Sequence, residues 1–210
     1  MSPPADLPED RALNVAFLVV DGVFNTELTA PYDIFHHTPF HTKPQPGMRV
    51  YTVSPDGQPI TTFEGLVLQP DYSFETAPTA DVLVVASAEH SKDRDLDNGA
   101  MIAWVRDAGR KATFVVSLCD GAFVLARAGL VDGHVSTTFP SDVDEYAAMF
   151  PQLDVRREVS FVHDGRLLTS QGGARSFDVA LYLVDQVARR VARGLVIEWP
   201  PSSMRALVLP

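Results

Sequence analysis

Four short apolar runs, separated by stretches of helical character, constrain this chain more than any other feature. Each run is rich in Val, Leu and Phe and is continuously apolar, as expected of strands that are buried on both faces. Strands of this kind that alternate with helices form a mostly parallel sheet. We therefore predict a doubly wound α/β fold with helices on both faces. The predicted strands are 14–20, 48–54, 81–86 and 112–118.

Helices are predicted between these strands and after the last of them. Their expected ranges are 28–37, 98–108, 121–128, 141–150 and 176–193. Between residues 55 and 70, turn residues alternate with short β-prone pieces, and residues 163–166 have the composition of a hairpin turn. We expect these parts to form small antiparallel additions at the edge of the sheet.

The length of 210 residues fits one domain, and 46% apolar residues can form a sizeable core. We expect a single domain over 1–210, in which residues 1–12 are flexible. Residues 194–210 are expected to form a tail that packs on the domain or on a partner subunit.

The charge and the apolar pattern exclude several kinds of partner. A formal net charge of −10 would repel phosphate backbones and anionic lipid, so nucleic acid and membranes are not expected to bind. The apolar run 15–20 is far shorter than the ~18 residues of a membrane span, and it lacks the basic flank of a secretory signal. A single cysteine forms no intrachain disulfide, which fits a reducing compartment. We therefore expect a cytoplasmic protein.

Cys119 lies where a predicted buried strand turns sharply into a predicted helix. Ser117 and Gly121 stand two residues away on either side, and a nucleophile elbow requires small residues there. The sulfur would face the amino end of the helix, whose dipole and free amides favour a thiolate and can donate to an oxyanion. We predict a nucleophile with a depressed pKa; the alternative is a buried, inert cysteine.

Asp120, directly after the cysteine, leaves two alternatives open for that pKa. A carboxylate that points inward would raise the pKa of the thiol, whereas one that points outward would only suit the helix start. A thiol pKa near or above the ~8.5 of free cysteine would count against both an enzyme and a redox sensor.

Glu27 follows the first predicted strand, just before a helix. Parallel strands present their carboxyl ends at one edge, where open α/β sheets bind ligands, so Glu27 and Cys119 could meet. A carboxyl beside the thiol would share its proton and act as general acid and base. The alternative for Glu27 is a solvated acid at a helix start. His90, which follows the third strand, is either a replacement base or a surface-loop histidine.

Several segments share their order and character with one known group of proteins. They are Asp21-Gly22 with Glu27-Leu-Thr-Ala-Pro31, the turn Ser117-Leu-Cys119-Asp-Gly121, Thr137-Thr138, Leu168-Thr-Ser-Gln-Gly-Gly173 with Phe177-Asp178, and residues 192–199. In this combination the chain resembles the ThiJ/PfpI superfamily, relatives of the class I glutamine amidotransferases, over nearly its whole length. The superfamily includes isonitrile hydratases, glyoxalase or deglycase-type enzymes, peptidase-like stress proteins and ligand domains of transcription regulators.

The resemblance implies a flavodoxin-like, glutamine amidotransferase-like fold with Cys119 as nucleophile and Glu27 as the proton-sharing acid. The turn at Glu27 is most similar to the isonitrile hydratase and regulator branches, which place Asp there. Two departures stand out. Phe139 and Pro140 occupy positions where many members have a histidine. Residues 85–90 lack the Pro-Gly-Gly whose backbone amides help to form the oxyanion site.

Two classes of function follow from these residues. The first is a cofactor-free cysteine enzyme that hydrates or hydrolyses a small electrophile, with backbone amides of Asp120 and Ala88 holding negative charge and His90, Phe139 and Gly172 at the pocket. The second is a small-molecule-binding or redox-sensing domain without turnover. In both cases we expect no metal, because no histidine pair has metal-ligand spacing with an acid. The superfamily resemblance and the apolar segment 195–199 suggest a homodimer.

Overall fold

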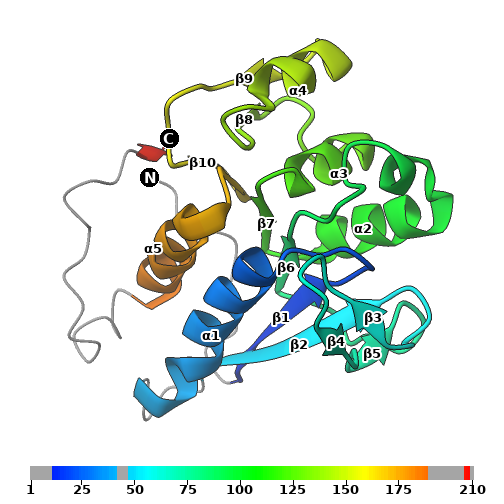
Figure 1. The fold of residues 1–210 in the computed structure, drawn as a ribbon. Helices are drawn as coiled ribbons and strands as arrows, with labels where there is room; N and C mark the ends of the chain where they lie inside the picture. The colour runs from blue at the N-terminus through cyan, green and yellow to red at the C-terminus, as the bar shows by residue number, and fades with distance from the viewer. Residues whose placement is uncertain (1–10, 42–46, 189–205, 209–210) are drawn as a thin grey trace.

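The computed structural model describes residues 11–41, 47–188 and 206–208 (Figure 1). An eight-stranded sheet with the order β12-β10-β11-β7-β6-β1-β2-β5 forms its centre. Neighbouring strands are parallel except for the antiparallel pair β10 and β11. The strands are β1 Leu13–Leu18, β2 Met48–Ser54, β5 Tyr72–Ser73, β6 Val82–Val85, β7 Phe114–Leu118, β10 Phe161–Asp164, β11 Leu167–Ser170 and β12 Ala206–Val208. The mostly parallel, doubly wound sheet that the sequence predicts is therefore confirmed.

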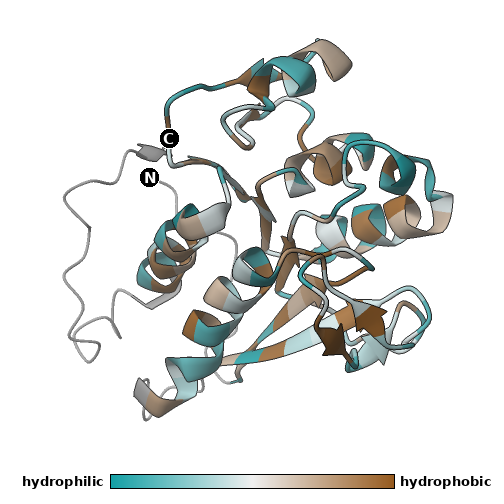
Figure 2. Cartoon of the chain, viewed as in Figure 1, coloured by the Kyte–Doolittle hydropathy of each residue, from teal (hydrophilic) through white to brown (hydrophobic). Residues whose placement is uncertain are grey.

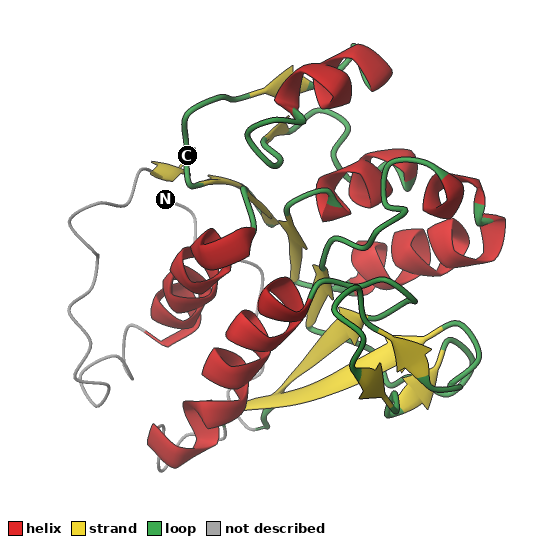
Figure 3. Cartoon of the chain, viewed as in Figure 1, coloured by secondary structure: helices red, strands yellow, loops and turns green. Residues whose placement is uncertain are grey.

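Helices cover both faces of this sheet (Figures 1 and 3). Side chains of β6 alternate between two apolar cores: Val82 and Val84 pack with residues of α1 and α5, whereas Leu83 and Val85 pack with residues of α2 and α3. Figure 2 shows the strands as mostly hydrophobic. The helices are α1 Asn25–His41, α2 Gly99–Lys111, α3 Gly121–Arg127, α4 Val143–Met149 and α5 Ser176–Ala188, with the short 3₁₀ helices η1 Arg94–Asp97 and η2 Gly173–Arg175.

Helix α1 extends four residues beyond the predicted end at residue 37, although Pro39 lies in its last turn. A proline has no amide to donate to the carbonyl four residues before it. Here the Thr38 hydroxyl donates to that carbonyl, Phe35 O, at 2.7 Å. The side chain of Thr38 thus replaces the missing backbone hydrogen bond and lets the helix continue.

The smaller β elements only partly match the expectation. The predicted hairpin is confirmed as β10 and β11. In the 55–70 region, β3 (Ile60–Thr61) and β4 (Val67–Leu68) are antiparallel, but they form a two-stranded sheet of their own and do not extend the central one. Gly22 N donates to Thr61 O at 2.8 Å, which ties this small sheet to the loop after β1. A second small sheet pairs β8 (Val135–Ser136) with β9 (Asp154–Val155) in parallel.

The predicted tail lies largely outside the described residues. Within 194–210, only residues 206–208 are described; they form β12, parallel to β10. The apolar segment 195–199, on which the expectation of a homodimer partly rests, is outside the described part, as are residues 1–10. In the described part of the chain, no helix combines the length and apolar character needed to cross a membrane.

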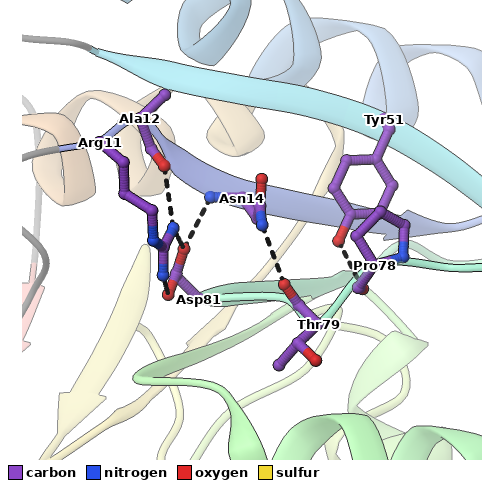
Figure 4. A network of polar contacts seen from close by, with 7 residues as sticks. All are labelled: Arg11, Ala12, Asn14, Tyr51, Pro78, Thr79 and Asp81. Atoms are coloured by element: carbon purple, nitrogen blue, oxygen red, sulfur yellow. Dashed lines mark hydrogen bonds and ion pairs between the residues drawn. The ribbon is translucent and has the colours of Figure 1, made fainter.

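Asp81 joins the amino ends of three neighbouring strands, and Figure 4 shows its contacts with Arg11 and Asn14. Its carboxylate accepts hydrogen bonds from both terminal nitrogens of Arg11, at 2.6 and 2.8 Å, and from Asn14 N at 2.8 Å. Its own amide donates to Asn14 O, and its carbonyl accepts from the amides of Thr113 and Phe114. Burial alone would raise the pKa of Asp81, but the hydrogen bonds from Arg11 and Asn14 and the charge of Arg11 lower it overall.

We expect Asp81→Asn to lower the free energy of unfolding by about 1–2 kcal/mol at neutral pH. Hydrogen bonds to a charged group contribute roughly 1.5–3 kcal/mol, and the half-exposed Arg11 side chain reduces that value. Because the folded-state pKa is depressed, this stabilisation is present above the ordinary pKa of ~3.9 and is lost as pH falls further. Chemical denaturation of D81N, R11A and the double variant between pH 3 and 7 measures it; strictly additive effects of D81N and R11A would contradict the coupling.

Candidate active site

Four adjacent parallel strands end at one edge of the sheet, and each is followed by a residue of the candidate site. In sheet order these strands are β11, β7, β6 and β1. The order reverses between β1 and β6, which is the switch point where open α/β sheets bind ligands. The residues that follow the strands are Gly172 and Gly173 after β11, Cys119 after β7, Ser87 after β6 and Glu27 after β1.

Cys119 lies in a backbone conformation that side chains rarely adopt, with a φ of 52°. Three hydrogen bonds hold it there: Cys119 N donates to Ser170 O at 2.9 Å, and Cys119 O accepts from the Thr138 hydroxyl at 2.9 Å and from Ala122 N at 3.2 Å. Gly121 permits the turn, because a Cβ at that position would lie 2.1 Å from Val85 O. The sequence Ser-x-Cys-x-Gly therefore folds as the sharp strand-to-helix turn of a nucleophile elbow.

Glu27 lies in the first turn of α1 and contacts the Cys119 side chain. Only 5% of the residue is exposed. One carboxyl oxygen, Oε2, accepts from Ser87 N at 3.1 Å, and the other, Oε1, accepts from Gly173 N at 3.1 Å. Burial raises the pKa of Glu27, although the hydrogen bonds from Gly173, Cys119 and Ser87 oppose the shift. The structure thus places a buried acid, fixed by two amides, against the sulfur.

The pKa of the Cys119 thiol is raised, opposite to the depressed value expected from the helix end. Burial is the largest cause, followed by the negative charges of Glu27 and Asp120. The Asp120 amide and the Ser87 hydroxyl act in the other direction, but they do not overcome it. The resting sulfur is therefore a neutral thiol, because burial and the two acids beside it outweigh the amino end of the short helix α3.

Asp120 points inward, which is the first of its two alternatives. It is 9% exposed, and its Oδ1 lies 3.1 Å from the Thr138 hydroxyl. Its carboxyl also interacts with Asp142. Asp142 in turn binds Lys92 Nζ at 3.0 Å, and the same nitrogen binds Glu145 at 2.9 Å. Burial and the charge of Asp142 raise the pKa of Asp120 to about 7, so this pair of acids retains a proton near neutrality.

We expect Asp120→Asn to stabilise the protein relative to the wild type as pH rises. The folded carboxyl keeps its proton up to about pH 7, whereas the unfolded one loses it near ~3.9. The folded state thus binds more protons between these values, and the wild type loses stability as pH rises through that window. Thermal unfolding is measured at pH 5 and pH 8. Between these values, the free energy of unfolding of D120N should rise by about 1–2 kcal/mol relative to that of the wild type. The exposed Asp107→Asn on α2 serves as control; equal gains in both variants would contradict the prediction.

The remaining predicted residues divide into two groups. Gly172 touches the site directly, since a Cβ there would lie 2.3 Å from Cys119 Cβ and 2.8 Å from Glu27 Oε1. Phe139 is 39% exposed and follows Thr138, whose hydroxyl donates a hydrogen bond to Cys119 O in the elbow. His90 Nδ1 lies 3.1 Å from Asp93 Oδ1, and its Nε2 faces Glu89, so its ring is paired within its own loop. The Ala88 amide donates to Ser91 Oγ at 2.8 Å and is therefore not free for an oxyanion.

Three contributors to the site escaped the sequence reasoning. Ser87 and Gly173 hold Glu27 through their amides, and a backbone amide leaves no signal in residue identity. Asp142 interacts with Asp120 although the two residues lie in different segments of the chain. The position of Ser87 just after a predicted strand at the same edge was the one available signal. In the described residues, no three or more His, Cys, Asp or Glu side chains gather as a metal site would require.

The elbow carries an acid against its cysteine, at the switch point of the sheet. Over residues 13–186, the chain matches the family model of DJ-1/PfpI. The chain belongs to the DJ-1/PfpI family. An isonitrile hydratase of Pseudomonas putida is 30% identical over 177 residues, which cover 84% of this chain and 72% of that protein. The transcriptional regulator CdhR of Pseudomonas aeruginosa is 33% identical over 139 residues; these cover 66% of this DJ-1/PfpI chain and 40% of the regulator.

Solved structures show the same fold. A ThiJ/PfpI family protein from Pseudomonas syringae superposes with a TM-score of 0.76 at 24% identity, covering 94% of this chain and 84% of that one. DJ-1beta of Drosophila melanogaster gives 0.74 at 18% identity, covering 90% of this chain and 100% of that one. At these identities the likeness establishes the DJ-1/PfpI fold, and activity has to be argued from the site.

Proposed function

We propose that this DJ-1/PfpI protein is a cofactor-independent enzyme in which Cys119 adds to a small electrophile and Glu27 transfers the protons. Small isonitriles are the substrate class to test first. The main support is the contact between the chain's single cysteine, at a strained elbow, and a buried carboxyl held by two amides. The 30% identity to an isonitrile hydratase supports the choice of substrate class.

Hydration of an isonitrile suits a thiol that keeps its proton. The terminal carbon of R–N≡C accepts both a nucleophile and a proton. In the proposed first step a C–S bond from Cys119 and a C–H bond form at this carbon, with the thiol proton passed through Glu27, to give a thioimidate. Water then adds to the same carbon, the C–S bond breaks, and Glu27 returns a proton to the sulfur. The products are R–NH–CHO and the restored thiol, and the balance consumes only water.

Negative charge that develops during these steps needs donors beside the sulfur. The Asp120 amide donates toward the sulfur and is one such donor. The protonated Asp120–Asp142 pair limits repulsion, because a neutral Asp120 places no charge beside the sulfur. On this proposal, activity declines as Asp120 ionises above about pH 7.

Turnover of a small alkyl isonitrile, followed by NMR of the N-substituted formamide, tests the proposal. Wild-type protein should form the formamide, Cys119→Ala should reduce the rate to the background of buffer, and Cys119→Ser should retain little activity because an alcohol is a weaker nucleophile. Formation at equal rates by the wild type and C119A, or no formation by the wild type, would contradict it. Thermal melts of all three proteins control for folding.

The second candidate is a ligand-binding domain without turnover. Two observations favour it. The Ala88 amide donates to Ser91 Oγ and is not free for an oxyanion, and the thiol pKa is raised, which we expected to count against an enzyme. The raised pKa also counts against a redox sensor, which needs a thiolate. The identity to CdhR agrees with a binding role. A ligand that raises the melting temperature, in a protein that turns over no isonitrile, would favour this candidate.

A further inference from the structure

The Ser87 hydroxyl is a buried polar group to which the proposed steps assign no role. The residue is 1% exposed, and its Oγ has no hydrogen-bond partner among the described residues. Folded proteins rarely bury a hydroxyl in this way, because the group loses its hydrogen bonds to water. The residue therefore calls for an explanation in terms of what else the hydroxyl faces.

The backbone of Ser87 is fixed on both sides. Its amide donates to Glu27 Oε2 at 3.1 Å, and its carbonyl accepts from Phe24 N at 3.1 Å. Ser87 follows β6 and Cys119 follows β7, two neighbouring strands in which Val85 pairs with Ser117, so the two residues lie at the same level of the sheet edge. The Ser87 hydroxyl is one of the groups that oppose the raised pKa of the Cys119 thiol. Ser87 thus holds Glu27 through its amide, and its hydroxyl, which has no hydrogen-bond partner among the described residues, lies at the strand end next to that of Cys119.

The loop after β6 has few other donors for the sulfur. The Ser87 amide is committed to Glu27, and the Ala88 amide is committed to Ser91 Oγ. An isolated bridge between Val23 and Ala88 holds the loop in this arrangement. The backbone of residues 87 and 88 therefore cannot turn its amides toward the sulfur without breaking these bonds.

We propose that the Ser87 hydroxyl is a catalytic hydrogen-bond donor to the Cys119 sulfur and takes the role that the committed amides of this loop cannot fill. The proposal rests on the proposed function, since it assigns a step in the same reaction. When the sulfur passes its proton to Glu27, and again when the C–S bond breaks, negative charge develops on sulfur between the two acids Glu27 and Asp120. A hydrogen bond to the sulfur becomes stronger as negative charge develops there, so it stabilises the transition states of these two steps more than the resting thiol.

Alkylation by iodoacetamide, measured against pH, tests this role without reference to any substrate. We compare the wild type with Ser87→Ala and with a matched control, Ser117→Ala. Ser117 Oγ is also buried and without a hydrogen-bond partner among the described residues, but it lies within β7, two residues before the cysteine. We expect S87A to slow alkylation about tenfold below the thiol pKa, the lower end of what a hydrogen bond to a charged group contributes. S117A should react like the wild type.

Turnover and rescue complete the test. In S87A, isonitrile turnover should fall about tenfold through kcat with the melting temperature unchanged, because the resting hydroxyl has no hydrogen-bond partner in the described part of the chain to lose. Ser87→Thr, which keeps the hydroxyl, should restore much of the alkylation rate. Alkylation of S87A at the wild-type rate, or equal slowing in S87A and S117A, would overturn the role of Ser87. If S87A alone slows alkylation while the wild type turns over no isonitrile, the proposed function fails and the role of Ser87 as a donor to the charged sulfur stands.

Discussion

Gly172→Ala is expected to lower the free energy of unfolding by about 2–4 kcal/mol and to abolish turnover. Gly172 has a φ of 75° and a ψ of −160°, a region that is essentially restricted to glycine and costs other residues on the order of 1–3 kcal/mol. The added methyl would also lie 2.3 Å from Cys119 Cβ and 2.7 Å from Cys119 N. One of the two chain segments has to move: a shift of the turn displaces the Cys119 sulfur, and a shift of the Gly172 loop removes the Gly173 amide from Glu27.

Gly173→Ala is the matched control for this experiment. Gly173 also has a positive φ, 54°, but a Cβ there meets nothing within 4 Å. Its amide, which donates to Glu27, is retained in the variant. We expect the free energy of unfolding to fall by about 1 kcal/mol, from the backbone conformation alone, and most of the activity to remain. Denaturation and formamide assays of both variants measure the difference; identical losses in G172A and G173A would show that the close approach to Cys119 has no effect.

The strands and the elbow could be predicted from the sequence because both depend on local composition. The continuous apolar runs that become β1, β2, β6 and β7 have the pattern of strands buried on both faces, and all four were predicted to within two residues. The same holds for the elbow around Cys119, where the tight turn leaves no room for a Cβ at Gly121.

The chemistry of the site could be predicted only in part, because it depends on contacts between distant segments. The inward direction of Asp120 is fixed by Thr138 and by Asp142, which no local pattern links to it. Burial between four strand ends then raises the thiol pKa, and this outweighs the helix end from which a lower pKa was expected. Commitment of the Ala88 amide to Ser91 Oγ is likewise a property of the folded loop.

Glu27→Gln is expected to separate proton transfer from thiol reactivity. The variant keeps the size of the side chain but loses the general acid, so isonitrile turnover should fall about 10²–10⁴-fold. It also removes the negative charge that raises the thiol pKa, so alkylation of Cys119 should become faster. Opposite changes in the two rates are the signature of a proton-sharing acid, because damage to the fold would lower turnover without making the thiol a better nucleophile.

The control for this pair of measurements is Glu64→Gln. Glu64 is exposed, accepts from Asn25 N at 3.0 Å and acts on Glu27 through its charge, but it makes no hydrogen bond to the sulfur. Its replacement should leave turnover within about threefold of the wild type, since single exposed charges contribute little.

The E27Q variant also loses a hydrogen bond. The carboxylate accepts from Ser87 N and from Gly173 N, and the amide group of Gln would direct its N–H toward one of these two donors. We therefore include Glu27→Asp, which retains an acid on a shorter side chain. If E27Q slowed alkylation as well as turnover, or if E27D lost turnover as completely as E27Q, Glu27 would act by holding the loops in place and another group would transfer the proton.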